Sequence, residues 1–93
     1  MESRILILDY GSPYTQQVAR RIREERVYCE IHPARVSTDW IRSWAPRGIV
    51  LSGGAAAAGD RAASLDPEVL RLGIPVLGIG YGNWRTYYME HYS

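Results

Sequence analysis

The hydrophobic residues of the chain are concentrated in short apolar runs, separated by segments of mixed polarity. Four of these runs are rich in branched residues, and each is followed within two residues by glycine or proline. This pattern is typical of strands that are buried on both faces of a sheet. The predicted strands are Arg4–Asp9, Val27–His32, Gly48–Leu51 and Pro75–Ile79.

The segments between the apolar runs predict helices. Ser12 and Ser37 are suitable N-cap residues, and Pro13 suits the first position of a helix. The predicted helices run from Pro13 to about Glu25, over Thr38–Trp44, and from Asp66 to Leu72. Strands that alternate with helices imply right-handed crossovers and a parallel sheet. We therefore expect one domain over residues 1–93, a three-layer α/β fold with a flavodoxin-like, four-stranded parallel sheet in the order 2-1-3-4.

The last segment, Asn83–Ser93, carries aromatic residues at helical spacing. Trp84, Tyr87, Tyr88, His91 and Tyr92 fall at i, i+3, i+4, i+7 and i+8. This spacing predicts a helix with an aromatic side. Such a side could pack on the sheet, or it could bind a partner, and the spacing alone leaves both interpretations open.

Composition narrows the possible chemistry. The 93 residues carry a formal net charge of +1, so no electrostatic argument favours nucleic acid or an anionic membrane as a partner. No lysine is present, which excludes Schiff-base chemistry and a P-loop lysine. Cys29 is the single cysteine and no zinc-ligand spacing occurs. With no signal peptide or long apolar span, we expect a cytoplasmic protein without metal or cofactor.

Three glycine-containing loops follow predicted strands and should meet at the carboxyl edge of the sheet. They are Tyr10-Gly11-Ser12, Ser52-Gly53-Gly54 and Gly80-Tyr81-Gly82. One interpretation is phosphate binding, although Asn83 stands where a third glycine of the dinucleotide fingerprint would fall. The other is acyl chemistry, because a strand that leads through G-x-x-x-G into a helix resembles a nucleophile elbow. Its centre is Gly80, which has no nucleophilic side chain.

Four segments of the chain together resemble a known family. They are ILILDYGSPYTQQVARR from Ile5, VYCEIHP from Val27, APRGIVLSGG from Ala45 and GIPVLGIGYG from Gly73. In order and spacing they are similar to the amino-terminal class I glutamine amidotransferase domain of the bacterial GMP synthetase family. The resemblance implies glutamine hydrolysis, with ammonia passed to a separate domain that aminates XMP using ATP.

The resemblance also implies roles for individual positions. The family's cysteine nucleophile falls on Gly80, and its oxyanion-hole amides fall on Gly53, Gly54 and Tyr81. The family's histidine and glutamate partners would lie beyond residue 93, and neither His32 nor His91 stands in a matching motif. On this basis we expect a chain that is not an enzyme, with a vestigial oxyanion hole and no catalytic side chain.

Departures from the family pattern fall on the predicted carboxyl edge, at Tyr10, Pro13, Ala55–Ala58, Gly80 and Asn83-Trp84. Changes confined to one rim suggest a scaffold that has been engineered or repurposed for protein binding or self-association. Aromatic residues with polar tips are favoured in such interfaces. The expected contact surface consists of Tyr10, Tyr14, Tyr81, Trp84, Tyr87, Tyr88 and Tyr92. The alternatives are a fragment or variant of the glutamine-hydrolysing domain, and a folding model without a partner.

Overall fold

The protein is built on a single five-stranded sheet. The computed structural model describes residues 3–53, 67–79 and 86–89. Within these residues the strands lie side by side in the order β2-β1-β3-β4-β5. Their bounds are β1 Arg4–Tyr10, β2 Tyr28–Pro33, β3 Gly48–Gly53, β4 Val76–Ile79 and β5 Thr86–Met89. The first four strands are parallel, which confirms the predicted order 2-1-3-4 and the flavodoxin-like α/β fold.

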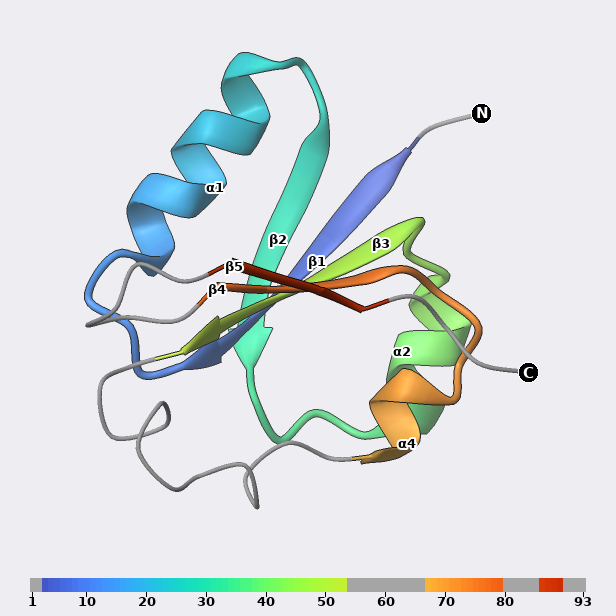
Figure 1. Cartoon of the computed structure of the whole chain (residues 1–93). Coiled ribbons are helices and arrows are strands. Elements are labelled where there is room, and N and C mark those ends of the chain that lie inside the picture. Colours follow the sequence, from blue (N-terminus) through green and yellow to red (C-terminus); the bar gives the residue numbers. More distant parts are fainter. Residues whose placement is uncertain (1–2, 54–66, 80–85, 90–93) are drawn as a thin grey trace.

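Helices cover both faces of the sheet, as Figure 1 shows. Helix α1 (Thr15–Glu24) packs on one face, where Ala19 and Cys29 belong to a buried cluster with Ile7 and Val50. Helices α2 (Thr38–Trp44) and α4 (Pro67–Leu70) pack on the other face. There, Ile41 and Val69 join a buried cluster of sheet residues, namely Leu6, Leu8, Ile49, Leu51 and Val76. The alternation of side chains along β1 therefore serves two cores, which is the expected three-layer arrangement.

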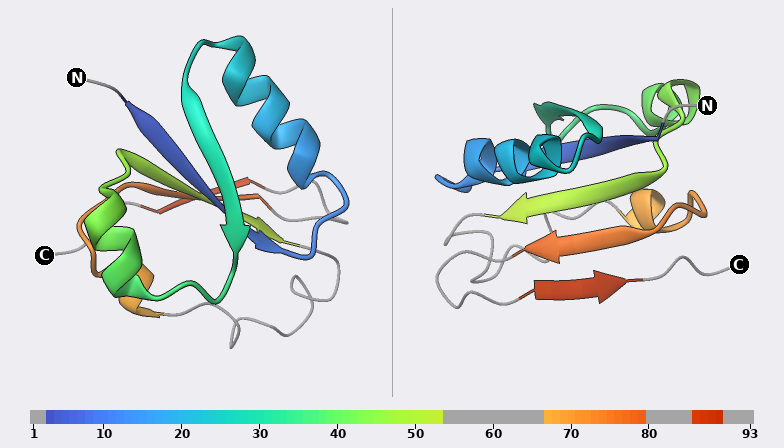
Figure 2. Two further views of the ribbon diagram at one scale, coloured as in Figure 1. Left: turned by 180° about the vertical axis from the view of Figure 1, so that it is seen from behind. Right: turned by 90° about the horizontal axis from the view of Figure 1, so that it is seen from above.

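The predicted carboxyl-terminal helix is wrong over Thr86–Met89, which form strand β5. This strand pairs antiparallel with β4, and Figure 2 shows its arrow opposed to those of β3 and β4 in the right-hand view. Leu77 lies opposite Tyr88 and Gly78 lies opposite Tyr87. The sequence TYYM is rich in residues that favour strands, and without it the edge of β4 would be unpaired. Sheet pairing therefore prevailed over the helical spacing.

The amino terminus of α1 also differs from the prediction. The helix begins at Thr15 rather than at Pro13. The Ser12 hydroxyl accepts a hydrogen bond from the Tyr14 backbone N–H at 3.0 Å, so Ser12 stabilises a turn before the helix instead of capping it. Gly11 has a φ of +99°, a conformation that suits glycine at this turn.

Helix α2 follows its prediction closely. Its bounds are the predicted ones, and the Ser37 hydroxyl accepts from the Trp40 backbone N–H at 3.1 Å, as an N-cap does. Trp40 and Trp44 are stacked with ring centroids 5.7 Å apart and pack against the core cluster of this face. The helix ends at Ala45, a non-glycine residue in the left-handed conformation with φ of 57°.

Candidate functional site

The candidate site lies at the carboxyl edge of the three central strands. In the sheet register, Asp9 of β1 is aligned with Ser52 of β3, and Ser52 is aligned with Ile79 of β4. These residues stand at or next to the ends of their strands, directly before the three glycine-containing loops. In an open parallel sheet this edge is where ligands bind. The structure thus brings together the ends of the three strands that lead to the predicted loops.

Two buried hydroxyl groups connect helix α1 to the end of β3. The Thr15 Oγ1 and Ser52 Oγ atoms are 2.8 Å apart, and the two residues are only 4% and 1% exposed. Thr15 Oγ1 also lies 3.1 Å from the carbonyl oxygen of Ser12 and 3.4 Å from the Asp9 carboxylate. Polar side chains buried to this degree are normally hydrogen-bonded, and these two satisfy one another.

The loop after β1 is fixed by the same carboxylate. The Gly11 backbone N–H donates to Asp9 Oδ1 at 2.8 Å. Gly11 also forms an isolated antiparallel bridge with Gly53, the last residue of β3. The β1 loop and the β3 turn are therefore connected through backbone as well as side-chain contacts. This geometry orders the backbone at the edge where the oxyanion-hole amides were expected.

The predicted site residues divide into those that the structure describes and those that it does not. Gly53 lies at the end of β3, within the edge. Gly54, Gly80 and Tyr81 lie outside the described residues, as do Trp84 and Tyr92. Tyr87 and Tyr88 form part of β5, and only their backbone is described. The expected roles of these seven positions stay predictions.

Two tyrosines of the expected contact surface are described with their side chains. Tyr10 is half-buried and packs against the core cluster on the α2 face. Tyr14 is half-buried and stands immediately before α1. Tyr10 therefore contributes to the core, while a role of either residue in binding a partner stays a prediction.

Thr15 and Ser52 were not among the predicted site residues. A signal for them exists in the sequence, because Ser52 begins one of the glycine-containing loops at the predicted carboxyl edge and Thr15 closely follows another. The contact between them joins residues that are 37 positions apart, and no local pattern contains that information. Only the crossover through β2 and α2 brings them together.

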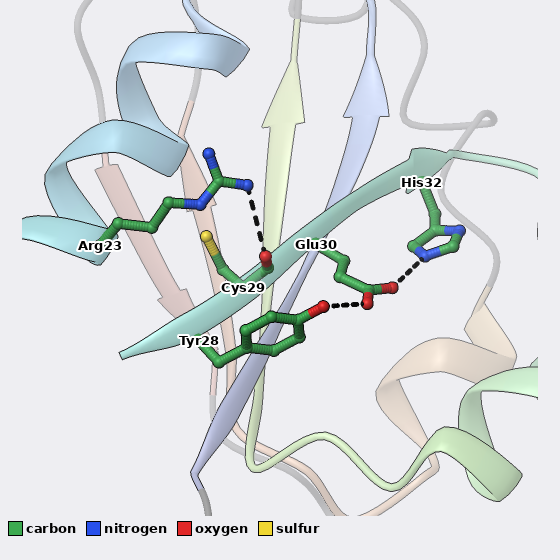
Figure 3. A network of polar contacts seen from close by, with 5 residues as sticks. All are labelled: Arg23, Tyr28, Cys29, Glu30 and His32. Carbon is green, nitrogen blue, oxygen red and sulfur yellow. Dashed lines mark hydrogen bonds and ion pairs between the residues drawn. The ribbon is translucent and has the colours of Figure 1, made fainter. Parts of the chain in front are cut away.

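A second polar cluster lies on edge strand β2, away from the carboxyl edge of β3 and β4 (Figure 3). The Tyr28 hydroxyl donates to one oxygen of the Glu30 carboxylate, and His32 Nε2 lies 2.9 Å from the other. The hydrogen bond from Tyr28, together with that from His32, lowers the pKa of Glu30 below its ordinary value. The same bond to a carboxylate raises the pKa of Tyr28. These are the effects expected when a carboxylate accepts hydrogen bonds.

The rest of β2 is held against α1. Cys29 is 2% exposed, with its thiol 3.6 Å from the carbonyl oxygen of Ala19, which confirms an ordinary buried thiol. Arg23 donates to the carbonyl oxygen of Cys29 at 3.4 Å, as Figure 3 shows. These contacts tie the edge strand to α1.

Two further kinds of site were searched for in the described part of the chain. Among residues 3–53, 67–79 and 86–89, no group of three or more His, Cys, Asp or Glu side chains could hold a metal ion. In the same residues, no helix has the length and apolar character needed to cross a membrane.

The fold and the edge define a doubly wound α/β protein with an ordered, glycine-containing site at the carboxyl ends of β1, β3 and β4. The family model described as glutamine amidotransferase class-I matches residues 6–84. The chain belongs to the class I glutamine amidotransferase family.

Individual relatives give the same result. The chain is 58% identical over 80 residues to a protein named GMP synthase [glutamine-hydrolyzing] of Nitrosococcus oceani, and 54% identical over 83 residues to that of Thiobacillus denitrificans. These matches cover 85% and 88% of this chain, but 15% and 16% of the relatives. A Burkholderia mallei protein of the same name is 53% identical over 83 residues. The chain thus spans about one-sixth of the length of these relatives.

The prediction that the chain is not an enzyme is wrong. It rested on glycine at position 80 and on the expectation that the family's histidine and glutamate partners lie beyond residue 93. The family of the chain, however, is that of the glutamine amidotransferases, and its relatives are named for glutamine hydrolysis. The same findings favour the alternative interpretation, a part of the glutamine-hydrolysing domain, over an engineered binding scaffold. The resemblance itself is confirmed, as is the fold that it implied.

Proposed function

We propose that the chain forms part of a glutamine-hydrolysing site in a GMP synthase-type amidotransferase. One observation carries the proposal: three strands with family-like sequences end side by side, with Asp9, Ser52 and Ile79 aligned in one row. Each of these strands leads into a glycine-containing loop of the family motif. The name of the relatives indicates the reaction, and the row of strand ends supports its location at this edge.

The hydrolysis converts the side-chain amide of glutamine into a carboxylate and ammonia. An oxygen nucleophile adds to the amide carbon, the carbonyl oxygen becomes negatively charged, and the C–N bond then breaks as the nitrogen takes up a proton. Backbone N–H donors that point at the developing oxyanion lower the barrier to this addition. In the proposal these donors come from the Gly53-Gly54 turn and from Tyr81.

Glycine at position 80 supplies no thiol, so water is the proposed nucleophile in this chain. Water attack forms no covalent glutamyl intermediate, which distinguishes it from attack by a cysteine. The rate enhancement then comes from substrate binding and the oxyanion donors, which in other hydrolases give about 10³-fold over water. In a GMP synthase-type protein the released ammonia would serve the formation of GMP.

The proposal is tested with glutamine labelled with ¹⁵N in its side-chain amide. The full chain is incubated with the substrate for several days, and release of labelled ammonium is followed by NMR. We expect release roughly 10³-fold faster than in buffer. Asparagine, which is one methylene shorter, serves as the control substrate and should be hydrolysed more slowly. Release at the buffer rate would reject the proposal.

A matched variant checks that the activity belongs to this edge. Gly80→Cys places a thiol at the position of the family nucleophile. It should release ammonium faster than the original chain and should gain the mass of a glutamyl thioester, seen by mass spectrometry. Equal rates for both proteins, without thioester in the variant, would show that glutamine is not held beside position 80.

A further inference from the structure

We propose that Thr15 is a positioning residue for the glutamine site, because its buried hydroxyl fixes the Ser52–Gly53 end of β3 against the loop between β1 and α1. The inference rests on the proposed function, since it names the residue that holds the proposed oxyanion turn in place. The observation behind it is the 2.8 Å contact between Thr15 Oγ1 and Ser52 Oγ, with both residues almost fully buried.

The available protons limit the directions that the hydrogen bonds can take, since either hydroxyl of the pair could donate to the other. Thr15 has one hydroxyl proton, and two acceptors that lie nearby are the Ser12 carbonyl oxygen at 3.1 Å and the Asp9 carboxylate at 3.4 Å. If Thr15 donates to either of them, Ser52 must donate to Thr15. The result is a directed chain from Ser52 through Thr15 to the β1–α1 loop. Linked hydrogen bonds of this kind strengthen one another in a buried setting.

Thr15 is held from its own side as well. It is the first residue of α1, and its backbone N–H lies 3.5 Å from the carbonyl oxygen of Ser12. Ala19, one turn further along the helix, is fully buried against the sheet. Helix α1 is therefore fixed against the sheet, and the Thr15 hydroxyl connects β3 to this helix.

The proposed oxyanion turn directly follows the residue that Thr15 contacts. Gly53 directly follows Ser52 and bridges to Gly11, whose N–H is bonded to the same Asp9 carboxylate. Ser52 is also aligned with Ile79, the residue before Gly80. A change at Thr15 thus reaches two of the three strand ends without touching the substrate.

The experiment compares four variants of the full chain by hydrogen exchange of backbone amides. Thr15→Val removes the hydroxyl and keeps the shape, while Thr15→Ser keeps the hydroxyl. Ser52→Ala removes the other partner and serves as a second test if Thr15→Val does not fold. Ile41→Val is the matched control, because it weakens the fully buried core on the opposite face of the sheet.

Exchange at Gly53 and Gly11 should become about tenfold faster in Thr15→Val and Ser52→Ala, relative to the amides of Cys29 and Ile31 on β2. Thr15→Ser should restore the original ratio, and Ile41→Val should leave that ratio unchanged. The proposal is overturned if the ratio is unchanged in both Thr15→Val and Ser52→Ala, or if Thr15→Ser behaves like Thr15→Val.

Ammonium release from labelled glutamine separates this inference from the proposed function. Thr15→Val should slow the release, and Thr15→Ser should preserve it. If the original chain shows no release, the proposed function fails, while the exchange ratio still decides whether Thr15 fixes the turn. If release is seen but is the same in Thr15→Val, the proposed function stands and the positioning role is overturned.

Discussion

The ring of His32 lies against the ring of Trp40, with centroids 4.4 Å apart and planes inclined by 46°. This contact joins edge strand β2 to helix α2. In addition, the Nε2 atom of His32 lies 2.9 Å from the Glu30 carboxylate on the same strand. Trp44 extends the contact on the other side, where the guanidinium of Arg4 lies 5.0 Å from its ring centroid. The edge strand is therefore held by tilted aromatic contacts and by a carboxylate.

Replacing the carboxylate at the centre of this cluster should change how stability depends on pH. The folded state lowers the pKa of Glu30 below its ordinary value of 4.5, so its contribution to stability is complete above that value. The contribution is lost as the pH falls through the lower folded pKa. Glu30→Gln should therefore reduce stability at pH 7 and have a smaller effect near pH 3. Urea denaturation at the two pH values measures this.

The exposed Glu25, which directly follows α1, provides a control for the charge change itself. Glu25→Gln should alter stability equally little at both pH values. If Glu30→Gln destabilised the protein by the same amount at pH 7 and at pH 3, the hydrogen bonds to Glu30 would not favour its ionised form.

Removing the stacked indole of Trp40 should lower the free energy of unfolding. The ring is half-buried, packs on the core of the α2 face, and contacts both His32 and Trp44. Fully buried tryptophans lose about 3–5 kcal/mol on truncation, so about 2 kcal/mol is expected for Trp40→Ala. Trp40→Phe, which keeps an aromatic ring, should lose less than half of that. Equal losses of unfolding free energy in Trp40→Ala and Trp40→Phe would show that an aromatic ring at position 40 contributes nothing to stability.

Glycine at position 45 should stabilise the protein. Ala45 ends α2 with a φ of 57° and donates its N–H to the Ile41 carbonyl oxygen at 2.9 Å. The left-handed conformation is costly for residues with a Cβ atom, and glycine adopts it freely. Ala45→Gly should therefore raise the unfolding free energy by about 0.5–1 kcal/mol. Thermal denaturation would show a higher melting temperature.

A glycine substitution at position 43, two residues before Ala45, provides the comparison for Ala45→Gly. Ser43 lies inside α2, where glycine is unfavourable, so Ser43→Gly should lower the melting temperature. A decrease in both variants would mean that the end of α2 does not require a left-handed residue.

Much of the fold could be predicted because its signals are local. The buried runs around Leu6 to Leu8 and Ile49 to Leu51 are continuous, and only strands covered on both faces carry such runs. Ser37 likewise predicted the start of α2, as its N-cap. The alternation of strands and helices then predicted a parallel sheet, and 2-1-3-4 was expected as the flavodoxin-like order.

The parts that were predicted incorrectly depend on contacts between distant residues. The spacing of Tyr87 and Tyr88 fits a helix, but the decisive interaction is pairing with Gly78 and Leu77 on β4. The start of α1 is a local exception, because Ser12 is a good N-cap by type, yet its hydroxyl accepts from the Tyr14 N–H in a turn before the helix. The link from Thr15 to Ser52 has no signature in either segment alone.

The prediction about activity failed for a different reason. It was drawn from Gly80 and from the expectation that the family's histidine and glutamate partners lie beyond residue 93, although the family and the fold are those of the glutamine amidotransferases. A missing side chain removes one route to the product, and in the proposed function the strand ends and backbone of the edge hold the substrate amide.

The most direct test of the account is to locate bound glutamine on the protein. The ¹⁵N-labelled chain is titrated with glutamine, and amide chemical shifts are followed by NMR. We expect the largest changes at Tyr10, Gly53 and Ile79, with little change at Tyr28 and Glu30 on β2. Shifts confined to β2 and α2, or no shifts at millimolar glutamine, would contradict a glutamine site at the carboxyl edge of β1, β3 and β4.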